Sequence, residues 1–107
     1  MFRWNEDIYM DETVKKRPYK YRNMIERHTK RKSCYCITMP QNDKNCMDVY
    51  SSKRLISPYD VRPEIEIIGL AADKDSAIEL VRQILTDIYV EYGTVDAGKV
   101  RAFFDHT

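Results

Sequence analysis

The clearest hydrophobic pattern in the chain lies between residues 74 and 92, where apolar residues recur every three or four positions. The repeating positions are Ala77, Val81, Ile84 and Ile88, and Ile78, Leu80, Leu85, Tyr89 and Tyr92 widen the stripe. Such spacing is typical of an amphipathic helix with one buried face. Asp73 or Asp75 can cap its first turn, and Gly93 supplies a left-handed end. The pattern predicts a helix over residues 74–92, roughly 28 Å long at about 1.5 Å per residue.

A β-branched run lies just before this helix. Ile65, Ile67 and Ile68 favour a strand, and two glutamates alternate with the first two of them. Alternation of this kind indicates a strand with one solvent-facing side. Gly69 ends the run. We therefore predict a strand near residues 64–68.

Two further strands are predicted in the middle of the chain. Residues 34–39 read Cys-Tyr-Cys-Ile-Thr-Met and are closed by Pro40 and the turn-rich residues 41–45. Residues 46–51 then form the hairpin partner. A loop over residues 52–63, which contains Pro58 and Pro63, leads to the third strand.

The two ends of the chain carry weaker patterns. Residues 1–14 mix aromatic and acidic residues without a clean period, which indicates an extended or frayed arm that docks through Trp4. A basic helix is expected over residues 18–31, with Pro18 in its first turn. Its narrow apolar stripe consists of Tyr21, Met24, Ile25 and His28. Near the other end, Thr94 or Asp96 can cap a short helix over residues 96–104, whose core-facing residues are Val100, Phe103 and Phe104.

Together these elements predict a small α+β domain over residues 15–107. We expect a three-stranded antiparallel sheet with the long C-terminal amphipathic helix packed on one face. The basic N-terminal helix or arm and the short final helix complete it. A chain of 107 residues fits one such domain.

The composition indicates the class of protein and the compartment in which we expect it. It is 43% apolar and 33% charged, which is typical of a globular chain. No apolar run approaches the roughly 18 residues of a membrane span, so we expect no membrane partner. The first residues lack the pattern of a signal peptide. Three cysteines make an odd count, which favours a reducing compartment over a disulfide framework. We therefore expect a cytoplasmic protein.

Charge is distributed unevenly although the formal net charge is only +1. Residues 15–32 carry nine Lys or Arg against the single Glu26, whereas residues 62–107 carry five basic and nine acidic residues. Cations interleaved with tyrosines can meet an acidic protein surface, or they can neutralise phosphates while the rings stack on bases. The candidate binding residues are Lys15, Lys16, Arg17, Tyr19, Lys20, Tyr21, Arg22, Arg27, Lys30, Arg31 and Lys32.

Two structural alternatives compete with this binding hypothesis. A run of charges is most often a solvated helix face. The basic segment can also act as an internal brace that lies against the acidic C-terminal half. The remaining tyrosines and Trp4 favour a protein partner or a homodimer if several of them are exposed together.

The cysteines raise a metal-binding alternative. Cys34, Cys36 and Cys46, with His28 upstream, supply enough ligands for a four-coordinate zinc ion. Their spacing differs from that of common zinc knuckles. Strand geometry also places Cys46 on the opposite face from the other two, so buried free thiols are the preferred interpretation.

Catalysis is not expected. The two histidines, His28 and His106, do not neighbour a cysteine in the sequence, and no nucleophile elbow, phosphate-binding loop or metalloprotease motif occurs. No cofactor is implied. The sequence therefore favours a non-catalytic binding or regulatory module with a protein partner, similar in size to accessory or inhibitory proteins of bacteria and mobile elements. Direct nucleic-acid binding is the first alternative, and a zinc-stabilised domain is the second.

Overall fold

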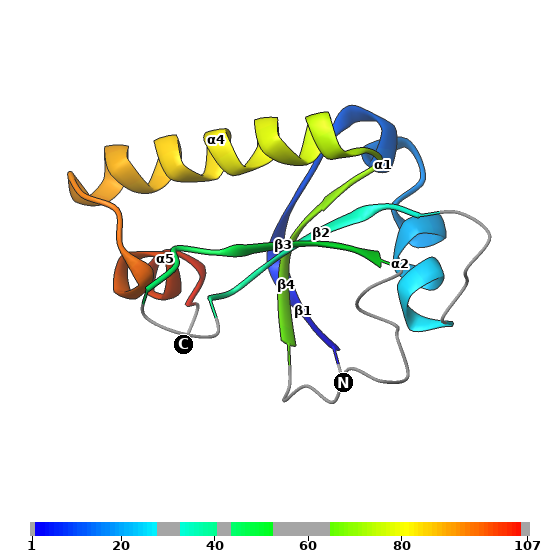
Figure 1. Cartoon of the computed structure of the whole chain (residues 1–107), viewed down its shortest axis with the longest axis horizontal. Helices are drawn as coiled ribbons and strands as arrows, with labels where there is room; N and C mark the ends of the chain where they lie inside the picture. The colour runs from blue at the N-terminus through cyan, green and yellow to red at the C-terminus, as the bar shows by residue number, and fades with distance from the viewer. Residues whose placement is uncertain (1, 28–32, 41–43, 53–64, 106–107) are drawn as a thin grey trace.

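The structure of the chain, a computed structural model, describes residues 2–27, 33–40, 44–52 and 65–105. Its elements in chain order are β1 (Phe2–Met10), α1 (Glu12–Lys16), α2 (Pro18–Glu26), β2 (Tyr35–Thr38), β3 (Asp48–Ser51), β4 (Ile65–Ala71), α4 (Lys74–Tyr92) and α5 (Ala97–Phe104). The four strands form one sheet in the order β1-β4-β2-β3 (Figure 1). The predicted α+β class is confirmed.

Strand β1 departs from the prediction. An arm is expected over residues 1–14, whereas Phe2–Met10 pair in parallel with β4. The sheet therefore has four strands rather than three and is mixed rather than purely antiparallel. Register shifts between Trp4 and Tyr9, so that β1 has four residues where β4 has one. This irregularity breaks the period-two alternation from which a strand is recognised.

Strand β4 lies at the centre of the sheet, between β1 and β2, and both of its faces are covered. Ile65 and Ile67 belong to one buried cluster, whereas Ile68 and Ala71 belong to the other. The expectation of one solvent-facing side is therefore wrong. The intervening Glu66 is half-buried, and it is satisfied by strand β1 through the Asn5 amide at 2.8 Å and the Arg3 guanidinium at 3.5 Å.

Gly69 lies inside β4 instead of ending it, since the strand continues to Ala71. A Cβ atom at this position would lie 2.9 Å from Cδ1 and 3.1 Å from Cβ of Ile37 on the neighbouring strand. Contacts this short are not tolerated without movement of the neighbour. Glycine is therefore the residue that allows β2 and β4 to approach each other here.

The predicted hairpin is present, with both strands shorter than expected. β2 pairs antiparallel with β3, so that Ile37 lies opposite Val49, and it pairs antiparallel with β4 on its other side. The Ser52 amide donates to the Cys34 carbonyl at 2.8 Å and extends the pairing beyond the strands.

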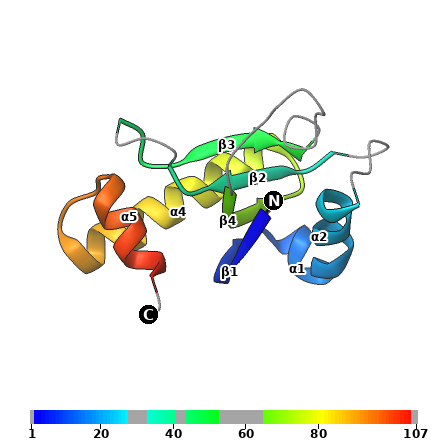
Figure 2. The same cartoon turned by 90° about the horizontal axis from the view of Figure 1, so that it is seen from below.

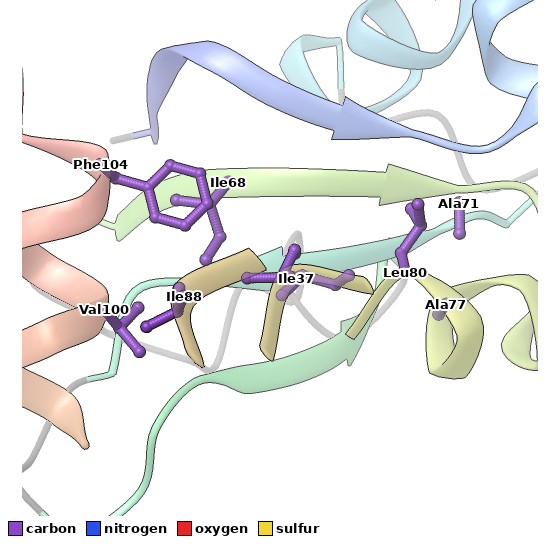
Figure 3. Packing of buried hydrophobic residues seen from close by; sticks show 9 residues of the cluster. Ile37, Ile68, Ala71, Ala77, Leu80, Ile88, Val100 and Phe104 are labelled. Carbon is purple, nitrogen blue, oxygen red and sulfur yellow. The ribbon is translucent and has the colours of Figure 1, made fainter. Parts of the chain in front are cut away.

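The long helix forms at the predicted residues, Lys74–Tyr92. Oδ1 of Asp73 accepts from the Ser76 amide at 2.8 Å, and Gly93 ends the helix with a φ of 76°. Its buried residues are Ala77, Leu80, Ile84 and Ile88. They pack on Ile37, Ile68 and Ala71 of the sheet, and Val100 and Phe104 of α5 complete this cluster (Figure 3).

Three residues of the widened stripe are exposed instead of buried. Ile78 is 47% exposed, Tyr89 61% and Tyr92 37%. The apolar stripe is therefore wider than the part of the helix that the sheet covers.

The final helix, α5, agrees with the prediction to within one residue. Asp96 caps it by accepting from the Lys99 amide at 2.8 Å. Val100 and Phe104 are buried, and Phe103 packs against them half-buried. The Tyr9 ring of β1 meets Phe104 edge to face, with ring centroids 5.9 Å apart.

The opposite face of the sheet carries the second buried cluster, which includes residues of α1 and α2. Its members are Val14, Ile25, Cys34, Cys36, Ile65, Ile67 and Leu70. Helices α1 and α2 lie at one end of the long axis of the molecule and α5 lies at the other (Figures 1 and 2). The N-terminal helices and α4 thus pack on different faces of one sheet.

Candidate interaction surface on helices α1 and α2

Asp11 fixes the first helix to the sheet. One of its carboxylate oxygens accepts from the Val14 amide at 2.7 Å and caps α1, while the other accepts from the Ala72 amide at 2.9 Å. The Asp11 amide in turn donates to the Leu70 carbonyl at 3.3 Å. One side chain therefore joins the start of α1 to the end of β4.

Helix α2 follows α1 after a single residue, Arg17. Pro18 occupies the first helical position, where its missing N–H costs nothing, as predicted. Met24 and Ile25 are buried and Tyr21 is half-buried, which confirms the predicted apolar stripe over these positions. The helix ends at Glu26 with Arg27 as its C-terminal cap, so it stops before the predicted end at residue 31. Residues 28–31, with His28, lie outside the described residues.

Trp4 of β1 connects α2 to the edge strand. Its indole N–H donates to the Glu26 carboxylate, and the Arg22 guanidinium lies 4.7 Å from its ring centroid. Both partners come from α2, so the ring is held along the helix rather than at one point. The expected docking of the N-terminal residues through Trp4 is confirmed.

The exposed surface of α1 and α2 is mainly cationic. Its exposed candidate residues are Lys15, Lys16, Arg17, Tyr19, Lys20 and Arg27, and the carboxylates of Glu12 and Glu26 are exposed there as well. Tyr19 is 75% exposed, the largest exposure among the aromatic side chains in the described part of the chain. An aromatic ring that stands out among cations is the main chemical feature of this surface.

The other candidate binding residues have different positions. Tyr21 and Arg22 are half-buried, with Arg22 committed to the Trp4 ring. The Tyr21 ring also lies next to one of the exposed cations, since the Lys20 ammonium is 5.7 Å from its centroid. Lys30, Arg31 and Lys32 lie outside the described residues. Six of the eleven candidates are therefore exposed on α1, on α2 or on the residues that join or follow these helices.

If the basic segment were an internal brace, its cations would contact carboxylates of the acidic C-terminal half. The contacts of two of these cations are given by the structure. Lys15 pairs with Glu12 at 3.4 Å, and Arg22 stacks on Trp4. In the described part of the chain, both partners belong to the N-terminal region and not to the acidic C-terminal half.

An acidic groove adjoins this surface on the other side of α1. It has a volume of about 690 Å³ and lies between the start of α1 and the first half of α4. Met10 and Leu80 contribute apolar lining. Five carboxylates and two cations also line the groove: Asp11, Glu12, Asp75, Glu79, Asp87, Lys15 and Arg82. Lys15 pairs with Glu12 and Arg82 pairs with Glu79, which leaves the groove with an excess of negative charge. The sequence pattern did not predict this groove, because its two walls are about 60 residues apart in the chain.

Strand β1 also bonds to α4 through one polar pair. The Tyr9 hydroxyl donates to the Asp87 carboxylate at 2.5 Å. Burial raises the pKa of Tyr9 well above its usual value, and the hydrogen bond to Asp87 and the charges of Asp87 and Asp7 raise it further. The hydroxyl therefore stays protonated and keeps donating at alkaline pH.

The three cysteines are free thiols in two different places. Cys34 and Cys36 are buried in the cluster under α1 and α2, whereas Cys46 packs against the cluster under α4. Within the described residues, no three Cys, His, Asp or Glu side chains converge as a metal would require. A hydrogen bond with the Cys34 thiol and burial raise the pKa of Cys36 well above the ordinary thiol value.

The role of Trp4 and the cap by Asp11 are the two features of this site that the sequence signals only faintly. The spacing of Asp11 and Val14 is that of a helix cap, but a five-residue helix is too short to show a period. The contact between Trp4 and α2 requires β1 to be placed in the sheet first.

None of the described helices is both long enough and apolar enough to cross a membrane. Comparison of the chain with protein-family models, curated proteins and solved structures finds no match in any of the three.

Proposed function

We propose that the protein is a small non-catalytic binding module that engages a macromolecular partner through the outer surface of α1 and α2. The observation that carries the proposal is Tyr19, which is 75% exposed among Lys16, Arg17 and Lys20. Tyrosine and arginine are the residue types enriched at the energetic centres of protein interfaces.

This surface rests on a fixed platform. Asp11 ties α1 to β4, and Trp4 holds α2 through Glu26 and Arg22. Side chains presented by a preorganised backbone lose less conformational entropy on binding. The platform therefore favours recognition by a folded surface rather than a loose electrostatic contact.

The partner we favour is a protein with an acidic surface. Direct binding to nucleic acid needs a continuous cationic path for the phosphates. On this molecule the cations of α1 are bordered by the acidic groove, whose carboxylates include Asp75 and Asp87. A strand of phosphates that left the basic surface toward α4 would meet those carboxylates. A compact acidic protein patch needs only the basic surface itself.

Two further aspects belong to this proposal. The raised pKa of Cys36 keeps its thiol protonated, whereas the hydrogen bond with Cys36 lowers the pKa of Cys34. Both side chains are fully buried, so neither thiol is accessible to a substrate, which does not suit a catalytic nucleophile. Three free cysteines suit a reducing compartment, and we place the protein in the cytoplasm.

The proposal is tested by reversing charge on the exposed surface. The variant Lys16→Glu/Arg17→Glu/Arg27→Glu changes three exposed cations, and Lys44→Glu/Arg82→Glu/Lys99→Glu is a control with the same change of charge elsewhere. Proteins captured from cell extract by the wild type and the control should be lost with the first variant. Circular dichroism checks that both variants fold.

A second measurement separates the two classes of partner. Binding of a random single-stranded and a random duplex oligonucleotide is followed at about 50 mM and about 200 mM salt, where phosphate contacts lose affinity steeply. Binding at low salt that the first variant abolishes would replace the protein partner with nucleic acid. Identical captured proteins for the wild type and both variants would overturn the proposed surface.

A further inference from the structure

Half of the six exposed large apolar side chains in the described part of the chain lie on one flank of α4. Ile78 is 47% exposed, Tyr89 61% and Tyr92 37%, and all three belong to α4. Val49 of β3 is 43% exposed. Single exposed apolar residues are ordinary on protein surfaces, whereas a contiguous group indicates an interaction site.

The three α4 residues share one flank of the helix. At about 100° per residue, Ile78, Leu85 and Tyr89 fall on the side opposite Asp87. The Asp87 carboxylate accepts from the Tyr9 hydroxyl, so its own flank faces β1. The apolar flank therefore faces the other edge of the sheet, where β3 lies (Figure 3).

Val49 extends the same surface onto the sheet. It lies opposite Ile37 in the hairpin, and directly paired residues point to the same face. Ile37 is buried in the cluster beneath α4, so Val49 also points to the α4 side. Half-buried Val81 and Leu85 lie along the helix between the exposed residues. We call this surface, Val49 with Ile78, Val81, Leu85, Tyr89 and Tyr92, the α4 flank.

We propose that the α4 flank binds the α4 flank of a second copy of this chain, with the two helices antiparallel. A two-fold axis near Leu85 would place Ile78 of each copy against Tyr92 of the other. The flank is apolar between Ile78 and Tyr89, so the same surface serves both copies, as a two-fold interface requires.

Charge at the two ends of α4 selects this orientation. Lys74 is exposed in the first turn of the helix, and the last turn contains no basic residue. Carbonyl groups at a helix C-terminus attract cations. In the antiparallel pair, Lys74 of each copy approaches the C-terminal end of the other helix, which Asp96 follows and where the Lys99 ammonium lies 5.3 Å from the centroid of the Tyr92 ring. A parallel pair would bring the two Lys74 ammonium groups together instead.

The area of the α4 flank determines how tight a dimer we expect. A helix about 28 Å long, with one valine beside it, offers less than the roughly 800 Å² per partner of a standard interface. We therefore expect a reversible dimer with a dissociation constant in the micromolar range. This inference does not depend on the proposed function, because α1 and α2 lie on the other face of the sheet. A dimer would carry two copies of the basic surface.

Sedimentation of the purified full chain tests the dimer over about 1 µM to about 1 mM protein, the range of weak association. The wild type should shift from monomer to dimer. Ile78→Lys/Tyr89→Lys should weaken association by at least about tenfold. Val90→Lys is the matched control, since Val90 is 80% exposed on another side of the same helix.

Cross-linking tests the orientation. Leu85→Cys should form a disulfide-linked dimer on mild oxidation, because Leu85 lies near the axis and meets its own counterpart. Ile78→Cys should not link to itself, but it should link to a Tyr92→Cys chain in a mixture. Circular dichroism verifies that each variant is folded.

Three outcomes would overturn the inference. A wild type that stays monomeric at the highest concentration would show that another molecule, or solvent alone, covers the flank. A dimer unaffected by Ile78→Lys/Tyr89→Lys would place the interface elsewhere. Efficient self-linking of Ile78→Cys would contradict the antiparallel arrangement.

Discussion

The two faces of the sheet are covered in different ways. On one face, α4 is a single helix of 19 residues with a cap at each end, and its contact with the sheet is almost entirely apolar. On the other face, α1 and α2 are short, and individual polar groups such as Asp11 and the Trp4 indole hold them. Burial holds the first face, whereas the second combines a smaller buried cluster, which includes Val14 and Ile25, with a few directed polar contacts.

This difference extends to the outer surfaces. The α4 flank is apolar, and the exposed side of α1 and α2 is cationic. Apolar surface gains free energy from burial with any shape-matched partner, whereas cations give orientation and rate to an encounter. One small domain can therefore offer two chemically distinct contacts at once.

Removal of a buried side chain under α4 is expected to have the largest effect. Ile84 is fully buried, and Ile84→Ala should lower the free energy of unfolding by about 2–5 kcal/mol through lost burial and the cavity left behind. Urea denaturation measures the change. The control Val90→Ala should shift it by less than about 0.5 kcal/mol, and an equal loss in both variants would refute the assigned helix face.

The close approach of β2 and β4 gives the second largest effect. Gly69→Ala places a methyl group 2.9 Å from Cδ1 of Ile37, and overpacking of this kind costs about 1–3 kcal/mol. Adding Ile37→Val to Gly69→Ala removes that Cδ1 atom and should recover part of the loss. Gly69→Ala with wild-type stability would mean that the strands are farther apart than described.

The polar contacts that hold α2 should contribute less to the free energy of unfolding than the two preceding features. The stacking of Arg22 on the Trp4 ring is expected to be worth about 0.5–1 kcal/mol. A double-mutant cycle with Trp4→Leu and Arg22→Gln isolates this energy by denaturation. Coupling near zero would show that burial, not directed contact, holds α2, and the contrast between the two faces would disappear.

The smallest effect appears only at alkaline pH. The pKa of Tyr9 is raised in the folded state above the value of about 10 in the unfolded chain. Stability from this group is complete below about pH 10 and is lost as the pH rises toward the folded pKa. The wild type should therefore lose stability between about pH 9.5 and 11 more steeply than Tyr9→Phe. Parallel curves would contradict the shift.

Local signals explain which parts of the fold could be predicted. The α4 boundaries are correct because Asp73, Gly93 and the apolar period all lie within the helix or next to it. The cap by Asp96 fixed α5 in the same way. Strand β1 was not predicted because its partner lies about 60 residues away and a register shift interrupts its alternation.

The candidate surface on α1 and α2 also has features that local sequence signals predict and features that depend on distant parts of the chain. A charge run between polar residues predicted that Lys16 and Arg17 would be exposed, and they are. That Arg22 would instead stack on Trp4 depends on β1, and so it could not be anticipated. Tyr89 was assigned to the buried stripe because a helical period gives a direction but not the width of sheet beneath it.

The parallel pairing of β1 with β4 has a consequence for synthesis in the cell. Residues 2–10 leave the ribosome before the strand they pair with, which ends at Ala71. At about 5–20 residues per second, β1 waits several seconds for its neighbour. During that time the Trp4 side chain and the hydrophobic residues of α2 have no sheet to pack on, so the second buried cluster forms only after β4 has been made.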